Sequence, residues 1–110
     1  MRMWMVNPKI MCRQHLLGEH VELHMSVGTI KKGISVKGYL DDNLLEPESI
    51  YQRHNELVKE MEARGYNHRS PLLLIPINMS KKIDREASLA ELIRRCPECR
   101  AQYDTISSPT

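Results

Sequence analysis

The groups best suited to chemistry lie near the start of the chain: the terminal amine of Met1 and the carboxylate of Glu22. A chain amine has an ordinary pKa near 7.7–8.0, against about 10.4 for lysine, so roughly 10–20% of it is neutral at pH 7. Only a neutral amine attacks an electrophilic carbon. A nearby carboxylate can stabilise the cationic imine that forms and can relay protons. We therefore interpret Met1 and Glu22 as a candidate reaction centre.

The residues around Glu22 are predicted to form a helix over 12–30 that positions it. One face of this helix is apolar, with residues at helical spacing: Leu16, Leu17, Val21, Leu23 and Val27. Another face carries His15, Glu19, Glu22 and Ser26, spaced four, three and four residues apart. Two acids three residues apart repel each other, which indicates either a functional site or a plain solvated face.

The segment before this helix is expected to be extended, because Pro8 disfavours helix at Asn7. We expect residues 1–11 to pack on the body, with Trp4 as a core residue rather than a platform for stacking bases.

The remainder of the chain predicts further helices and one connector. Ser49 and Gln52 fit a capping box before a helix that runs to Arg64, and Gly65 suits its end. The inward side chains of that helix are predicted to be Ile50, His54, Leu57, Val58 and Met61. Residues 71–77, with two prolines, are expected to form a buried extended connector. A third helix is predicted from near Asp84 or Ser88, and Pro97 is expected to end or kink it.

Composition is consistent with one globular domain of 110 residues, with 41% apolar and 27% charged residues. We predict an all-α, compact single domain of about three main helices with an extended N-terminal segment packed on the body. The helical domain is expected to cover residues 1–104, followed by a flexible tail over 105–110. The three cysteines do not describe a secreted disulfide scaffold, and no run approaches the length of a membrane span. We therefore expect a cytoplasmic protein, with no membrane association and no obligate protein partner.

The chain has a net charge of +2 and its first third is net positive, which suits a phosphate backbone, although a solvated face is the simpler interpretation. Three stretches there and beyond carry a more specific pattern: Met1 to Trp4 with Gln14-His15-Leu16, Glu19, Glu22 and Val27-Gly28; Arg53 to Leu57; and Arg64 to Asn67. This pattern resembles the pyrimidine dimer DNA glycosylases, small all-helical repair enzymes first known from phage.

The resemblance implies a mechanism and a substrate, damaged double-stranded DNA, with no cofactor. The α-amine of Met1 would attack the sugar carbon that bears the damaged base, with Glu22 assisting. The resulting Schiff base would lead to β-elimination and strand cleavage, which is AP-lyase activity. Because Arg2 is large, Met1 is expected to be retained, and this keeps the family's separation between amine and glutamate. The expected DNA-binding residues are Arg2, Lys9, Arg13, Gln14, His15, Lys31 and Lys32.

Two departures from the family pattern bear on the lesion that is recognised. Arginines that the phage enzyme carries near the glutamate correspond here to Val21 and Met25, and its aromatic C-terminal tail has no counterpart after Tyr103. Both features help to grip damaged DNA, so the departures concern dimer specificity more than amine chemistry. The alternative is a non-catalytic DNA-binding or zinc-stapled helical module that retains only the fold.

Two sets of residues offer competing metal chemistry. Cys12 and His15 form a CxxH, and Cys96 and Cys99 form a CxxC, which together would supply four zinc ligands if the termini were adjacent. This mixed set is weaker evidence than two CxxC pairs, and we expect no metal, with Cys12 buried and reduced. His20 and His24 are spaced as a metal pair but lack the HExxH order, so we expect a partly buried helix edge. His54 is expected to be a histidine at the edge of the core.

Overall fold

The computed structural model describes residues 1–68, 70–72 and 74–107, and every regular element among them is helical. In chain order these are η1 (Pro8–Ile10), α1 (Arg13–Lys31), α2 (Lys37–Asp41), η2 (Pro47–Ser49), α3 (Ile50–Ala63), α4 (Arg85–Arg95) and α5 (Pro97–Ser107). The all-α prediction is confirmed. The sequence predicted about three main helices, whereas the described chain has five α-helices, because α2 and α5 were not foreseen.

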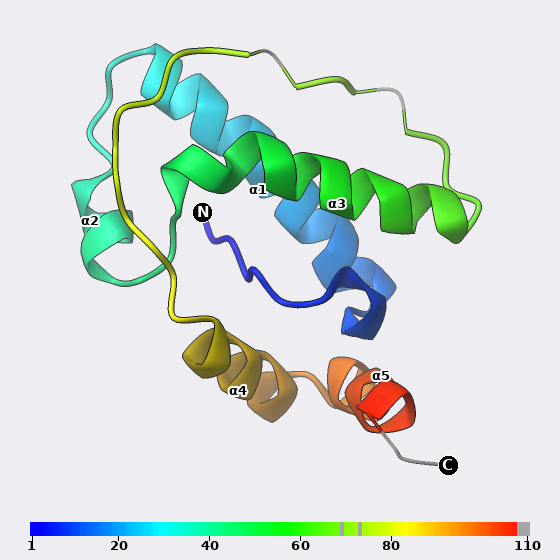
Figure 1. Cartoon of the computed structure of the whole chain (residues 1–110). Coiled ribbons are helices and arrows are strands. Elements are labelled where there is room, and N and C mark those ends of the chain that lie inside the picture. Colours follow the sequence, from blue (N-terminus) through cyan, green and yellow to red (C-terminus); the bar gives the residue numbers. More distant parts are fainter. Residues whose placement is uncertain (69, 73, 108–110) are drawn as a thin grey trace.

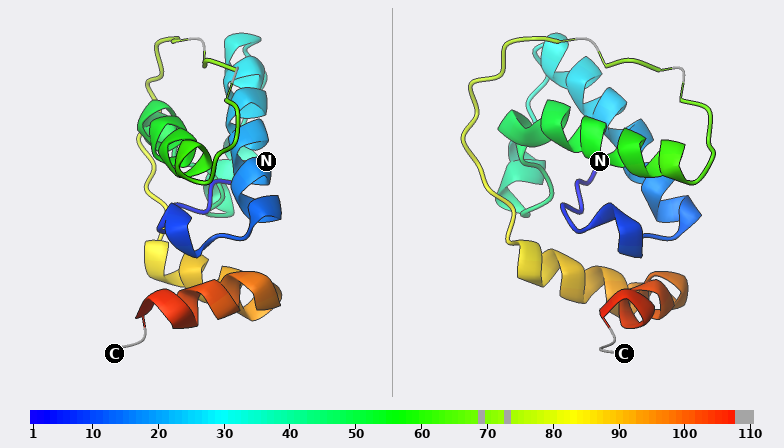
Figure 2. Two further views of the ribbon diagram at one scale, coloured as in Figure 1. Left: turned by 90° about the vertical axis from the view of Figure 1, so that its right-hand side faces the viewer. Right: turned by 45° about the vertical axis from the view of Figure 1, so that its right-hand side comes forward.

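The helices form two groups with the start of the chain between them (Figure 1). Helices α1 and α3 pack across one another, and α4 and α5 lie together at the other end of the molecule (Figures 1 and 2). The N-terminal segment runs between the two groups and has no regular helix over residues 1–7, as predicted, whereas Pro8–Ile10 of the segment expected to be extended form η1. Met3, Trp4 and Val6 are buried there, and Met3 N–H donates to the Leu44 carbonyl at 2.8 Å.

Helix boundaries follow local signals in the sequence. Asn7 caps η1 by accepting a hydrogen bond from the Lys9 N–H at 3.0 Å, and Pro8 opens that short helix. Helix α3 ends at Ala63, one residue before the predicted Arg64, and the predicted stop Gly65 follows with a φ of 84° in the left-handed region. Asp84 caps α4 through the Ala87 N–H at 3.1 Å. Pro97 begins α5 rather than merely ending α4, because a proline is tolerated in the first turn of a helix.

Several packing predictions were wrong. Ser49 precedes α3 but makes no capping hydrogen bond, because its hydroxyl donates to the carboxylate of buried Glu46 instead. Val21 was predicted to face the core but is 55% exposed, whereas Glu19 is buried. The connector over 71–77 is extended but not buried: its described residues alternate between exposed and half-buried, and Leu74 is 77% exposed. Residue 73 lies outside the described residues.

A buried carboxylate, Glu46 at the start of η2, holds the beginning of α4 and the residues before it. Glu46 accepts hydrogen bonds from the Ile83 N–H at 2.8 Å and from two guanidinium nitrogens of Arg85 at 3.1 and 3.2 Å, in addition to the one from Ser49. Burial alone would raise the pKa of Glu46, but these hydrogen bonds outweigh burial and leave the pKa lowered. The charged form of Glu46 is therefore part of the folded structure.

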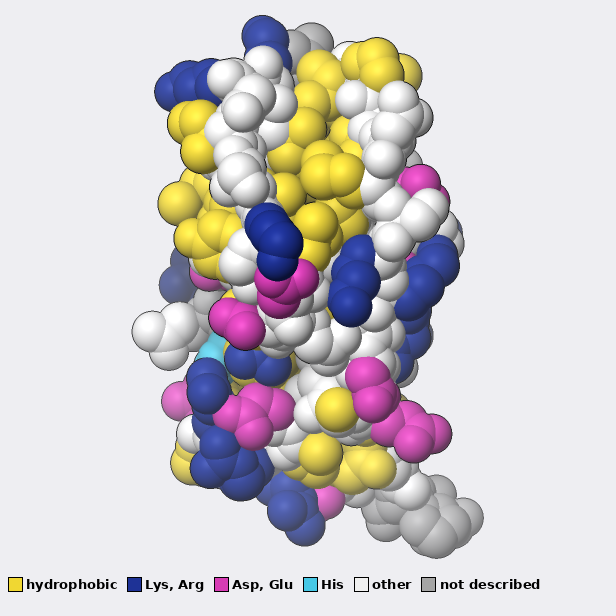
Figure 3. Space-filling view, turned by 90° about the vertical axis from the view of Figure 1, so that its left-hand side faces the viewer, with side chains coloured by type: hydrophobic (Ala, Val, Ile, Leu, Met, Phe, Trp, Pro, Cys, Tyr) yellow, Lys and Arg dark blue, Asp and Glu magenta, His cyan; other side chains and the backbone are white. Residues whose placement is uncertain are grey.

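Helix α5 continues to Ser107, three residues beyond the boundary predicted for the globular part, and 108–110 lie outside the described residues. On the face viewed from the side of α2, hydrophobic side chains gather in the upper half and charges of both signs are mixed in the lower half (Figure 3). A shallow groove there is lined by Ile30, Ile34, Val36, Leu40 and Met79, among others. The mixture of charges makes this face a poor candidate for binding a polyanion.

Candidate active site

The first residue of the chain lies against the middle of α1. Burial raises the pKa of the Glu22 carboxyl group, whereas the charge of the chain amine and the nearby backbone N–H of Arg2 act to lower it. The Met1 side chain continues along the helix, where its sulfur lies 3.4 Å from the Ser26 hydroxyl and 3.9 Å from that of Thr29. Glu22, Ser26 and Thr29 are successive neighbours on one helix face. The start of the chain and Glu22 therefore lie on the same side of α1, close enough for the charge of the chain amine to act on the carboxyl group.

The Glu22 carboxyl sits in an environment that favours its protonated form. Burial raises its pKa, and the charge of Glu19 acts in the same direction. The positive chain amine and the Arg2 N–H oppose this effect but do not cancel it. A carboxyl group with a raised pKa exchanges protons more readily near neutral pH, which suits a group that relays protons.

Glu22 opens into a pocket of about 290 Å3. Its lining comes from the N-terminal segment, the first half of α1 and the end of α4: Arg2, Trp4, Gln14, His15, Gly18, Glu19, Glu22 and Arg95. The Arg2 guanidinium lies 3.7 Å from the centroid of the Trp4 ring, and the His15 ring meets Trp4 edge-on at 5.8 Å. This stack holds the wall of the pocket in place.

Two arginines make the pocket suitable for an anion. Burial lowers the pKa of Arg2, and the charge of Arg95 lowers it further. The Nε atom of Arg2 is buried and has no hydrogen-bond partner among the described residues. A phosphate would satisfy this donor and would relieve the repulsion between the two guanidinium groups.

Arg53 holds the segments that line the pocket, and its role was not identified from the sequence. Its guanidinium donates to both Glu19 oxygens at 2.6 and 2.9 Å, to the Val6 carbonyl at 2.6 Å and to Glu56 at 3.1 Å. Burial alone would lower the pKa of Arg53, but the hydrogen bonds to Glu19 and Glu56 leave it raised. Arg53 thus joins α3 to α1 and to the N-terminal segment. Glu19 is committed to this ion pair, which leaves Glu22 as the acid that faces the amine.

The predicted DNA-binding residues separate into two groups. Arg2, Gln14 and His15 line the pocket. Lys9, Arg13, Lys31 and Lys32 are exposed outside it, and the Arg13 guanidinium lies 5.5 Å from the Tyr66 ring centroid. At 1.5 Å per residue, Lys31 lies about 14 Å along the helix from Glu22. Arg95 also lines the pocket, and it could not be selected from the sequence because α4 is distant from α1 in the chain.

The structure brings the four possible zinc ligands together and places the His20–His24 pair in a larger histidine cluster. The ligand atoms of Cys12, His15, Cys96 and Cys99 lie within 4.8 Å of one another. The histidine pair was expected at a helix edge, but His20 is buried and joins His24, His54 and His68 in a cluster with the same limit of 4.8 Å. Burial, followed by the charges of its histidine neighbours, lowers the pKa of His20 to about 4.

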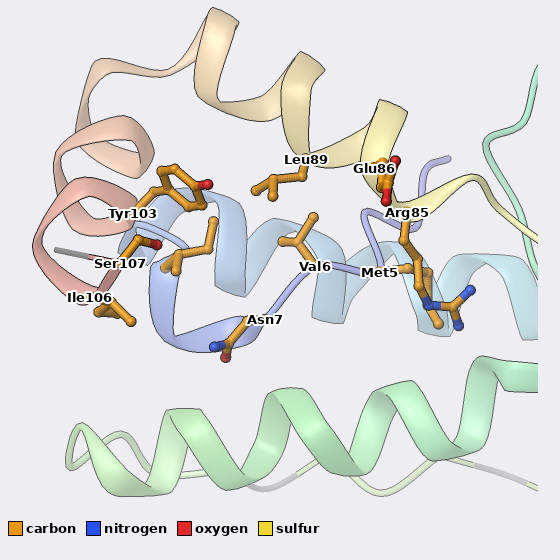
Figure 4. Close-up of a pocket in the computed structure, with 10 residues that line it drawn as sticks. Met5, Val6, Asn7, Arg85, Glu86, Leu89, Tyr103, Ile106 and Ser107 are labelled. Atoms are coloured by element: carbon orange, nitrogen blue, oxygen red, sulfur yellow. The ribbon is translucent and has the colours of Figure 1, made fainter. Parts of the chain in front are cut away.

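A separate apolar pocket of about 300 Å3 lies between the N-terminal segment and helices α4 and α5 (Figure 4). Val6, Leu89 and Tyr103 point into it (Figure 4). It shares no lining residue with the pocket at Glu22. Its lining is mostly apolar, so it does not extend the candidate reaction centre.

The start of the chain, the half-buried Glu22 carboxyl group and two arginines thus share one pocket, which combines a possible amine nucleophile, a proton-exchanging acid and positive charge for an anion. The family model described as pyrimidine dimer DNA glycosylase matches residues 1–74 of the 110. The chain belongs to this family, whose function is glycosylase-type DNA repair on damaged DNA. Neither the search of curated proteins nor that of solved structures found a match. Among the described residues, no helix is long and apolar enough to cross a membrane.

Proposed function

We propose that this protein is a DNA glycosylase with AP-lyase activity that uses the Met1 amine as nucleophile and Glu22 as its acid–base partner. The observation that carries the proposal is the position of the chain start: the Met1 sulfur lies 3.4 Å from the hydroxyl of Ser26, one helical turn from Glu22, and the charge of the chain amine acts on the Glu22 carboxyl group. The proposal requires Met1 to be the N-terminus of the working protein.

The reaction follows from this arrangement. The neutral amine attacks C1′ of the damaged nucleotide, the C1′–N bond breaks, and the base leaves with the bonding electrons and takes up a proton. Ring opening gives a protonated Schiff base between the Met1 nitrogen and C1′, and the Glu22 carboxylate stabilises that positive charge. Loss of a C2′ proton to a base then expels the 3′ phosphate by β-elimination, and water hydrolyses the Schiff base to free the amine.

Substrate binding is assigned to the pocket and to the helix beside it. Arg2 and Arg95 would hold the phosphate next to the lesion, and Gln14 would contact the displaced nucleotide. Arg13 and Lys32 stand about 28 Å apart along α1, which matches roughly eight base pairs of duplex. They would position the DNA backbone along the helix without reading its sequence.

Borohydride trapping on duplex DNA with an abasic site tests the proposal. We expect a covalent adduct whose N-terminal peptide carries the sugar fragment by mass spectrometry. The adduct should disappear when the N-terminus is acetylated. Absence of an adduct, with a free Met1 amine verified on the same sample, would favour the alternative of a non-catalytic DNA-binding module.

Glu22→Gln separates catalysis from binding. The variant keeps the shape of the side chain but cannot accept a proton or carry negative charge, so it should bind abasic duplex normally and lose strand cleavage by about 100-fold or more. Glu62→Gln is the matched control, because Glu62 is exposed near the end of α3. Unchanged cleavage by the Glu22 variant would remove Glu22 from the mechanism.

A further inference from the structure

All three cysteines of the chain and one histidine converge between the start of α1 and the junction of α4 with α5. The Cys12 sulfur lies 3.2 Å from His15 Nδ1 and 3.8 Å from the Cys96 sulfur, and the Cys99 sulfur lies 3.7 Å from the same nitrogen. A tetrahedral zinc ion with ordinary bond lengths requires about 3.8 Å between two sulfurs and about 3.6 Å between sulfur and nitrogen. The spacing of these ligand atoms is therefore close to that of a zinc site.

Backbone groups around the cluster are arranged to support thiolates. The Cys12 N–H donates to the Cys99 sulfur at 3.2 Å, and the Cys99 N–H donates to the Cys96 sulfur at 3.4 Å. Such N–H donors stabilise negative sulfur and orient metal ligands. Cys12 and Cys99 are buried and Cys96 is half-buried, so the set is closed, as structural zinc sites are.

We propose that Cys12, His15, Cys96 and Cys99 bind one structural Zn2+. Cys96 and Cys99 lie outside the matched residues 1–74, so the ion would fasten the C-terminal helices to the glycosylase-family part of the chain. It would also fix two residues of the reaction pocket: His15, whose ring packs on Trp4, and Arg95, which directly precedes Cys96. With Nδ1 on the metal, His15 is a positioning residue.

Metal analysis and cobalt substitution test this site independently of DNA repair. The full chain, purified with reduced thiols, should contain zinc, and Co2+ exchange should give an intense thiolate-to-cobalt band. Cys12→Ser and Cys96→Ser should lose that band, and Glu98→Gln, an exposed change within the same CxxC, should keep it. Chelation should lower the melting temperature. Free thiols with no cobalt band, or a Cys12–Cys96 disulfide in the protein as isolated, would overturn the proposal.

A different observation carries a second site. His20 and His24 from α1, His54 from α3 and His68 from the following connector pack with ring centroids 4.9 to 5.3 Å apart. The Nε2 atoms of His20, His24 and His54 are buried and have no hydrogen-bond partner among the described residues. A buried polar atom without a partner is destabilising, because it has lost its hydrogen bonds to water. Three such atoms in one cluster indicate that something absent from the protein chain itself satisfies them.

We infer that the four histidines bind a divalent first-row transition metal. Imidazole nitrogens suit zinc, nickel, copper and iron, and four nitrogens within 4.8 Å of one another can surround one ion. The His68 Nε2 lies 2.8 Å from the Ser70 carbonyl, so its Nδ1 is the atom left for the metal. Bound there, the ion would join α1 to α3 and hold the start of the connector against both.

Zinc content of a double variant tests the histidine site. His24→Gln with His68→Ala changes two half-buried ligands, so the variant should fold. We expect it to bind about one equivalent of Zn2+ less than the parent chain while the thiolate-to-cobalt band stays unchanged. The control variant Asn67→Ala changes an exposed neighbour of His68 and should bind as much Zn2+ as the parent chain. Equal zinc content in the double variant and the parent would refute this site.

Discussion

The buried ion pair between Arg53 and Glu19 provides the sharpest test of how the reaction pocket is held. The Arg53 side chain is 1% exposed and that of Glu19 is fully buried, with N–O distances of 2.6 and 2.9 Å. Arg53 also donates to the Val6 carbonyl. Replacing Arg53 with methionine therefore leaves a buried carboxylate without its partner and a carbonyl without its donor.

Arg53→Met is expected to cost about 3–5 kcal/mol in the free energy of unfolding, the range for breaking a buried ion pair on one side. That is a large part of the roughly 5–15 kcal/mol that holds a typical domain together. Combining Arg53→Met with Glu19→Met removes the stranded charge. The double variant should be more stable than Arg53→Met alone, although it carries more changes, because only the Val6 carbonyl remains unsatisfied.

Urea unfolding followed by circular dichroism measures the three variants and the parent as a double-mutant cycle. The coupling energy should exceed about 2 kcal/mol. Arg100→Met is the control, because Arg100 pairs with Asp104 on the surface, where both side chains are 57% exposed and such pairs contribute about 0–1 kcal/mol. If the cost of Arg53→Met resembled that of Arg100→Met, or if the single costs simply added, this account of the pocket's support would be wrong.

Three further predictions concern pH, substrate binding and surface charge. The pKa of Glu46 is lower in the folded than in the unfolded chain, where it is about 4.5, so the charged carboxylate stabilises the fold fully above that unfolded pKa. This stabilisation is lost as pH falls through the folded pKa, so Glu46→Gln should weaken the dependence of the unfolding free energy on pH in acid. The same pH dependence in parent and variant would contradict this. Trp4 is the only tryptophan of the sequence and lines the reaction pocket, so titration with abasic duplex should change the protein's fluorescence. If the emission stays unchanged at concentrations where a gel shift shows binding, the DNA binds elsewhere on the protein. Val21→Arg and Met25→Arg each add a positive charge at an exposed position of α1, so each should strengthen DNA binding at low salt. Each should also steepen the plot of log binding constant against log salt concentration by about 0.9. Val21→Gln, measured in parallel, should leave this slope unchanged.

Local patterns in the sequence determined much of this protein. Apolar spacing and a proline predicted a helix over 12–30, and the structure has it over Arg13–Lys31. Gly65 marked the end of α3 to within two residues, because glycine adopts a positive φ readily. The family pattern selected Glu22 over Glu19, and the structure gives a physical basis for that choice, since Glu19 is occupied by Arg53.

Only the tertiary structure decided which side chains, distant in the sequence, lie in contact. Periodicity placed Val21 inward and Glu19 on a polar face, but it could not register that Arg53, 34 residues away, would neutralise Glu19 and allow its burial. For the same reason, the sequence could not predict that Arg95 lines the pocket, or that the cysteine and histidine residues gather into two clusters. Spacing along a helix is fixed by backbone geometry, whereas partnership between helices depends on how their side chains pack, and no local pattern encodes that packing.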